Sequence, residues 1–166
     1  LAGVDNAFGI TGQVHVSTGA TLDLNGFDQI VGSLSGAVGL VRLGRGTLIT
    51  GRDNTSTVFA GSIEGPGGLV KEGNGVLTLS GASTYTGGTY VSGGGALAGT
   101  TTSLGGQIVN NAEVIFVQDT DGTFLGHMSG SGRFIKRGTG AVTIADANTY
   151  TGGTQVDEGV LVGSAA

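Results

Sequence analysis

The chain contains an internal repeat, and this feature restricts its fold more than any other. Residues 68–97 align with residues 133–162 without a gap, and 13 of the 30 aligned pairs are identical. A unit of this size cannot bury its apolar side chains alone and does so by stacking on its neighbours. The sequence therefore predicts a single repeat segment over residues 1–166. The similarity continues upstream, and the predicted units are about 32–57, 58–97 and 123–162.

Apolar residues alternate with small polar residues inside each unit, as in Leu77 and Leu79 or Val142 and Ile144. A period of two residues is typical of β-strands. Glycine, at 36 of 166 residues, recurs between these short runs. The strand spacing also suits a sandwich or a barrel, but the repetition favours a solenoid. We predict an all-β, right-handed parallel β-helix with three sheets and about six or seven coils, since three strands per coil require roughly 22 to 27 residues.

The charge pattern argues against two classes of protein. The net charge is −5, and the seven Lys and Arg residues are scattered, so we expect no binding to nucleic acid. Glycine and threonine interrupt every apolar run, so we expect no membrane insertion. The absence of cysteine removes thiol catalysis and thiolate metal sites.

A six-residue string, Thr-Tyr-Thr-Gly-Gly-Thr, occurs in both long units and predicts a corner between strands. Ser83 or Asn148 can hydrogen-bond its own backbone to open the turn, the tyrosine supplies a large ring, and the glycine pair provides positive φ. We expect the two tyrosines to be partly buried on corresponding corners and to face the same way, although ligand binding by these rings is an alternative. The predicted structural corner residues are Tyr85, Gly87, Gly88, Asn148, Tyr150, Gly152 and Gly153.

Few residues suggest chemistry. His15 lies in an outward strand position, and His127 is replaced by serine in the preceding copy, so both are interpreted as solvated surface residues. Asp119 and Asp121 have part of the spacing of a calcium loop but lack its distal glutamate, which favours a hydrogen-bonded turn. No catalytic motif occurs, and the clustered carboxylates of a polysaccharide-cleaving β-helix are missing. We predict no enzyme activity, no catalytic residue, no cofactor and no metal site.

Two other segments break the pattern. Both faces of residues 113–118 are apolar, and we expect Val114 and Phe116 to point inward, which leaves Ile115 and Val117 exposed as a contact strand. Residues 93–106 are rich in glycine and nearly uncharged, which predicts a flexible insertion.

The residues Leu69, Lys71, Gly73 and Gly75, followed by 84–89, resemble the passenger-associated transport repeat of bacterial autotransporters. The same pattern recurs from Lys136 to the string that contains Tyr150. Two further stretches, 20–36 and 110–132, are similar to the same family. Ser83 departs from the motif, which has asparagine there, and residues 54–57 lack both the tyrosine and the glycine pair.

This resemblance implies a fragment of a longer passenger, secreted or displayed on the surface of a Gram-negative bacterium. Its implied partners are the neighbouring coils and an outer-membrane β-barrel. The resemblance implies a structural role as a stalk and as a folding and export-assisting unit of a virulence-type surface protein. The alternative is an adhesin that binds a host-cell receptor through a strand face or a loop.

Overall fold

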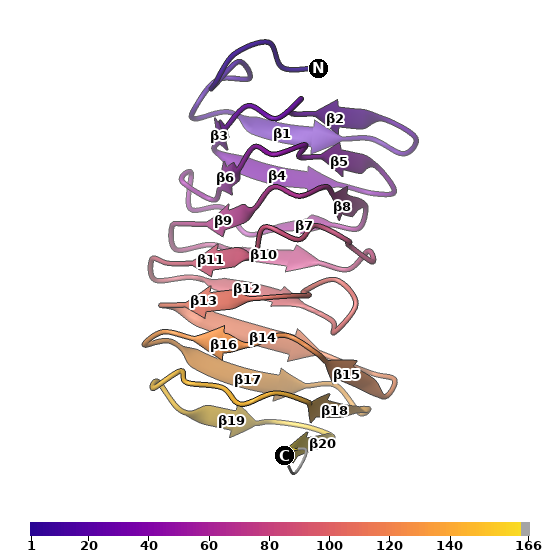
Figure 1. Cartoon of the computed structure of the whole chain (residues 1–166), viewed down its shortest axis with the longest axis vertical. Coiled ribbons are helices and arrows are strands. Elements are labelled where there is room, and N and C mark those ends of the chain that lie inside the picture. The colour runs from indigo at the N-terminus through magenta and orange to yellow at the C-terminus, as the bar shows by residue number, and fades with distance from the viewer. Residues whose placement is uncertain (164–166) are drawn as a thin grey trace.

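The computed structural model describes residues 1–163, which form a solenoid of short parallel strands stacked along one axis (Figure 1). None of these residues is helical, and no helix long and apolar enough to span a membrane occurs among them. Every strand pairing is parallel, with strands of one coil lying on strands of the next. The predicted all-β parallel solenoid is thus confirmed.

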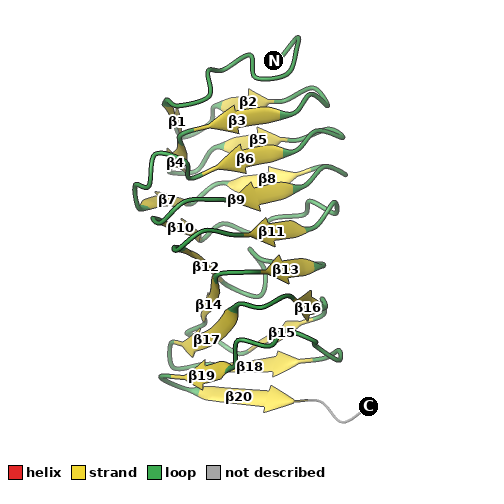
Figure 2. Ribbon diagram, turned by 90° about the vertical axis from the view of Figure 1, so that its left-hand side faces the viewer, coloured by secondary structure: helices red, strands yellow, loops and turns green. Residues whose placement is uncertain are grey.

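Three faces surround the core, and the chain visits them in a fixed order (Figure 2). The long sheet consists of β1 (Gln13–Val16), β4 (Ser33–Gly36), β7 (Thr57–Phe59), β10 (Val76–Leu79), β12 (Ala96–Gly99), β14 (Glu113–Val117), β17 (Arg133–Arg137) and β19 (Thr154–Val156). The second sheet consists of β3 (Gln29–Val31), β6 (Leu48–Thr50), β9 (Leu69–Lys71), β11 (Thr89–Val91), β13 (Ile108–Asn110) and β16 (Met128–Ser129). The third face carries β2 (Thr21–Asp23), β5 (Leu40–Arg42) and β8 (Ser62–Glu64), and after an interruption β15 (Gly122–Phe124), β18 (Ala141–Ile144) and β20 (Val160–Gly163).

The solenoid has more coils than the sequence predicted. The long sheet has eight strands, one from each coil, so the expectation of six or seven coils was too low. Gln13 pairs with Ser33, and Glu113 pairs with Arg133, which sets these coils at 20 residues. The coils are short because tight glycine corners join strands that are mostly only three or four residues long.

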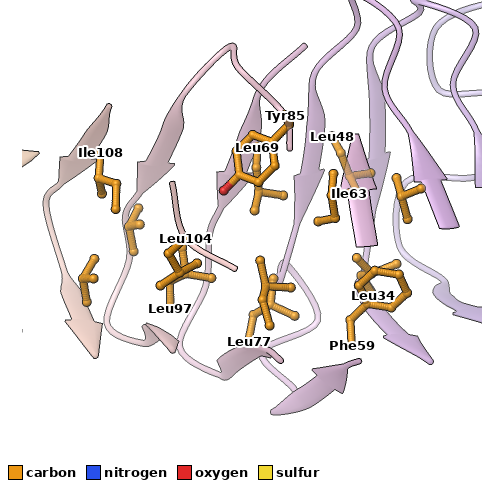
Figure 3. Close-up of a cluster of buried hydrophobic side chains, with 14 of the residues drawn as sticks. Leu34, Leu48, Phe59, Ile63, Leu69, Leu77, Tyr85, Leu97, Leu104 and Ile108 are labelled. Atoms are coloured by element: carbon orange, nitrogen blue, oxygen red, sulfur yellow. The ribbon is translucent and has the colours of Figure 1, made fainter. Parts of the chain in front are cut away.

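The core is a stack of inward-pointing apolar side chains. In the region that Figure 3 shows, mostly aliphatic side chains of successive coils lie next to one another, together with Phe59 and Tyr85. Further along the chain the core becomes aromatic, because the ring of Phe116 lies 5.2 Å from that of Phe124 and 5.4 Å from that of Phe134. Each coil alone exposes these side chains, so burial couples it to its neighbours.

The two long repeat copies do not begin on the same face. The first copy begins with β9 in the second sheet, whereas the second begins with β17 in the long sheet. Leu69 stacks through Thr89 and Ile108 onto Met128, and Phe134 lies one strand beyond, on the next face. The second copy is therefore rotated by one face relative to the first.

Candidate functional site: the repeated corner module

Each repeat copy stacks its second half on its first half. In the first copy Leu69 pairs with Thr89 and Leu77 pairs with Leu97. In the second copy Phe134 pairs with Thr154 and Val142 pairs with Leu161. One unit therefore covers a full coil and returns onto itself, although the two copies occupy different faces.

The string that contains the tyrosine replaces a strand on one face. In the first copy it lies on the third face, where Thr84 N donates to Ile63 O at 2.8 Å and Thr86 N donates to Gly65 O at 3.0 Å. Ile63 N in turn donates to the Ser83 hydroxyl at 3.2 Å. This side chain provides the acceptor that a strand backbone would supply.

The second copy repeats these bonds on the face of the second sheet. Thr149 N donates to Met128 O at 2.9 Å, and Thr151 N donates to Gly130 O at 2.9 Å. Met128 N donates to Asn148 Oδ1. Serine and asparagine are interchangeable here because either oxygen reaches the strand of the preceding coil, which accounts for the departure at Ser83.

Both tyrosines fold back onto a threonine four residues later. The Tyr85 hydroxyl lies 2.6 Å from Thr89 Oγ1, and the Tyr150 hydroxyl lies 2.5 Å from Thr154 Oγ1. Tyr85 is 6% exposed and lies among the core side chains near Leu69 (Figure 3), and this burial raises the pKa of its phenol. Tyr150 is only half-buried.

The expectation that these two rings lie on corresponding corners and face the same way was wrong. Tyr85 belongs to the third face and Tyr150 to the face of the second sheet, because the repeat copies are rotated. What the rings share is the bond to a threonine four residues later. Tyr150 also packs its ring 6.1 Å from Phe134, which lies at the start of the same coil.

The two glycines of each pair have different roles. Gly88 and Gly153 have φ of 83° and 85°, the left-handed region that favours glycine. Gly87 and Gly152 do not, but a Cβ on either would overlap the backbone of the preceding coil, at Gly67 and Gly132. The expected positive φ thus belongs to the second glycine only, and the first is required by close stacking.

Two lysines of the repeat are buried, which the sequence analysis missed. Lys71 is 1% exposed, and its Nζ donates to Glu72 O at 2.6 Å and Gly73 O at 3.4 Å. Burial lowers the pKa of this ammonium group. The sequence did contain a signal, because Lys71 follows Leu69 by two residues and so occupies an inward position of the strand.

Lys136 is the counterpart in the second copy and is fully buried. Its Nζ lies within hydrogen-bond distance of four carbonyl oxygens, those of Gln118 at 3.5 Å, Arg137 at 2.7 Å, Gly138 at 2.6 Å and Glu158 at 3.2 Å. Three successive coils supply these acceptors. The lysine therefore ties the corner to its neighbours from inside the solenoid.

Comparison with known proteins identifies this module. Residues 69–98 and 134–162 match the family model described as the passenger-associated-transport-repeat. The chain is autotransporter passenger sequence. It is 36% identical, over an alignment of 180 positions, to the protein named adhesin BmaC autotransporter of Brucella suis biovar 1 (strain 1330). That alignment covers 86% of this chain and 5% of the adhesin. No solved structure gives a significant match to the chain.

This passenger sequence is thus secreted or displayed on the surface of a Gram-negative bacterium. The repeat model matches the two self-stacked modules and begins at the first strand of each. The residues of the family signature therefore form one complete coil together with the start of the next coil, which stacks on it. They include the buried lysine, the tyrosine and the glycine pair of both copies.

The outer surface of the passenger carries ion pairs between adjacent coils. They are Arg42–Glu64 at 2.8 Å, Arg52–Glu72 at 2.5 Å, Arg133–Glu113 at 2.5 Å and Arg137–Asp157 at 2.9 Å. All four are solvent-exposed, and surface ion pairs of this kind contribute little to stability. Both lysines are bound to carbonyls, and Arg45 is the one arginine of residues 1–163 that forms no ion pair.

The predicted contact strand is only partly exposed. Val117 is 39% exposed, but Ile115 is 5% exposed, so the expectation of an exposed Ile115 was wrong. Ile115 does point outward, and Ala98 and Ile135 of the adjacent coils pack against it on both sides.

The prediction of a flexible insertion at 93–106 was also wrong, because this segment contains β12 and a corner that buries Leu104.

The residues considered for chemistry take part in contacts between coils. His15 Nδ1 lies 3.0 Å from Ser35 Oγ, and the ring of His127 contacts Ala147 O. Asp121 Oδ1 accepts from Ala141 N of the next coil at 2.8 Å, so this carboxylate joins two coils instead of closing a local turn. Residues 1–163 contain no group of three His, Cys, Asp or Glu side chains placed to hold a metal ion.

Proposed function

We propose that this chain is a non-catalytic structural part of an autotransporter passenger that acts as stalk and as folding and export-assisting unit. The observation that carries this proposal is the use of the repeat signature. Lys136, the glycines and the Ser83 or Asn148 oxygen contact neighbouring coils. Lys71 and both tyrosines are bonded to groups close by in the chain. None of these groups is left free for a substrate.

Export assistance follows from the direction of these contacts. The backbone donors of Thr84, Thr86 and Gly87, and those of Thr149, Thr151 and Gly152, reach acceptors in the coil that precedes them in the chain. A coil that arrives later can therefore dock on one already formed, and each docking step buries apolar surface. In the whole protein the partner would be an outer-membrane β-barrel linked to the passenger.

Removal of one coil in register tests the stalk in the full-length protein. Deletion of 134–153 lets Thr154 take the place of Phe134, because these residues pair in the long sheet. We expect surface display and unchanged adhesion per displayed molecule. Deletion of 134–143 is the matched control, since it shifts the faces out of register and should abolish display.

Export assistance has a separate readout. Tyr85→Ala together with Tyr150→Ala should slow the appearance of the passenger at the cell surface, measured by protease accessibility over time. Normal kinetics in this variant would contradict the export role. Equal display of the 134–143 deletion would contradict the stalk.

The second candidate function is adhesion by this segment itself. It is favoured by the printed name of the relative, an adhesin, and by exposed apolar side chains on the second sheet, Tyr90 at 42% and Val109 at 37%. In that case substitution of Tyr90 or Val109 by a polar residue would abolish adhesion, while surface display and stability remain unchanged.

A further inference from the structure

A groove runs along the solenoid axis at the corner between the third face and the second sheet. Its volume is about 440 Å³, and residues of four successive coils line it, including Arg45, Gly67, Gly87, Tyr90 and Gln107. Neighbouring coils are about 4.8 Å apart, so Arg45 and Tyr90 are roughly 10 Å apart along the axis. The groove is thus long and narrow rather than a closed pocket.

Glycines keep the floor of this groove free of side chains. A Cβ on Gly67 would overlap the carbonyl of Gly46, and one on Gly87 would lie 2.5 Å from the carbonyl carbon of Gly67. The backbone along the floor is already paired, since Leu69 N donates to Gly88 O at 3.0 Å and Thr89 N donates to Gln107 O at 2.9 Å. An extended peptide therefore finds no free strand edge here.

Tyr90 forms an apolar wall of the groove. It is 42% exposed, and its hydroxyl accepts from Asn111 Nδ2 at 3.2 Å, which fixes the ring at its polar end. The corresponding residue of the second copy is Gln155, so the repeat does not require an aromatic ring at this position. An exposed ring that is held by a hydrogen bond presents a flat apolar surface and loses little side-chain conformational entropy when a ligand binds.

Arg45 supplies the charge. It is exposed and forms no ion pair in residues 1–163, and no Asp or Glu lines the groove. It is the one charged side chain among the residues that line the groove. Arg45 also borders an adjacent groove of about 770 Å³, which Asp23 lines as well and where Arg42 is already paired with Glu64.

We propose that this groove binds an acidic oligosaccharide that lies along the solenoid axis. The apolar face of one sugar ring packs on Tyr90, sugar hydroxyls bond to Gln107 and Thr47, and a carboxylate or sulfate group binds Arg45. The separation of Arg45 and Tyr90 requires more than one sugar unit. This inference concerns the outer surface and does not depend on the structural role of the repeat.

Titration of this chain with three hexasaccharides tests the proposal, by NMR or calorimetry. A hyaluronan fragment carries carboxylates, a heparin fragment adds sulfates, and maltohexaose is neutral. We expect binding of one or both acidic fragments that weakens with salt, and binding of maltohexaose at least fivefold weaker, the scale of one exposed charge contact. The acidic fragment that binds identifies the charged group.

Two variants locate the site. Arg45→Gln should weaken acidic-fragment binding roughly fivefold and Tyr90→Ala roughly three- to tenfold, which are the scales of one charge contact and one ring contact. Gln13→Glu, which changes the net charge equally at an exposed position of β1, should change affinity less than twofold. Val58→Ala, at an exposed position of β7, is the matched control for Tyr90→Ala.

The proposal fails if neither acidic fragment binds at millimolar concentration, or if both site variants bind as the parent does. Equal affinity for maltohexaose would overturn the role of Arg45. Equal affinity for a hexaglutamate peptide would overturn the assignment to a sugar. Thermal unfolding of each variant, expected to match the parent because both side chains are outside the core, separates lost binding from lost structure.

Discussion

The two repeat copies, 69–98 and 134–162, have the same local structure on different faces of one solenoid. In both, a tyrosine bonds to a threonine, a glycine lies against a glycine of the preceding coil, and a lysine turns inward to backbone carbonyls. The comparison teaches that the unit specifies how one coil lies on another. It does not specify the face on which that happens.

The copies differ in how deeply they are buried. Tyr85 lies in the core, whereas Tyr150 is half-buried, and Lys71 has two carbonyl acceptors where Lys136 has four. Equivalent residues should therefore contribute unequally to stability. Residues whose contacts are equal in both copies should contribute equally.

The largest expected effect is that of the tyrosines. Tyr85→Ala should lower the free energy of unfolding by about 4 kcal/mol and Tyr150→Ala by about 2 kcal/mol, because truncation of a fully buried ring leaves a larger cavity. Denaturant unfolding measures both. The hydroxyl alone is tested by Tyr85→Phe and Tyr150→Phe, which should each cost about 1 kcal/mol. Equal costs for the two alanine variants would contradict the difference in burial.

The glycines of close approach should behave alike in both copies. Gly87→Ala and Gly152→Ala should each cost about 3 kcal/mol, since the new Cβ overlaps backbone that cannot move aside cheaply. Gly105→Ala is the matched control, because a Cβ there meets nothing within 4 Å, and it should stay within about 0.5 kcal/mol. Clearly different losses of unfolding free energy for Gly87→Ala and Gly152→Ala would show that the two corners are not equivalent.

The buried lysines should again separate the copies. Lys136→Met should cost about 3 kcal/mol and Lys71→Met about 1 to 2 kcal/mol, because methionine keeps the volume but abandons four or two carbonyl oxygens. Chemical denaturation measures these costs. Arg52→Met, at an exposed ion pair, should change stability less than either lysine variant. A larger loss from Lys71→Met than from Lys136→Met would reverse the ranking.

The smallest effect is a dependence on pH that Lys71 introduces. Burial lowers its pKa in the folded state below the ordinary lysine value of 10.5. Below the lowered pKa both states carry the proton and the burial cost is fully present. Between the two pKa values the unfolded state binds more protons, so stability rises with pH in that window. The parent should therefore gain stability relative to Lys71→Met as pH approaches 10.5 in urea titrations; a constant difference between the two proteins would argue against a shifted lysine.

Local pattern was sufficient to predict the parallel β-solenoid and the corner strings, because alternation and glycine placement act within a few residues. The same rule, extended to Lys71 and Lys136, places both lysines inside, since each follows an inward apolar residue by two positions. Ile115 was predicted to be exposed because it points outward. Its burial depends on Ala98 and Ile135, which are distant in sequence and adjacent only across coils.

The sequence by itself determined the repeat, the inward and outward positions of the strands, and the autotransporter passenger resemblance. The tertiary structure alone decided the number of coils, the face of each copy and the groove at Arg45 and Tyr90. The physical reason lies in the corners. Alternation within each strand decides which of its side chains face inward. The face that the chain reaches after several coils depends instead on the lengths of all the corners between. Because the corners vary, the residues that pair on adjacent coils are between 17 positions apart, as for Ala96 and Glu113, and 23 positions apart, as for Gly36 and Phe59.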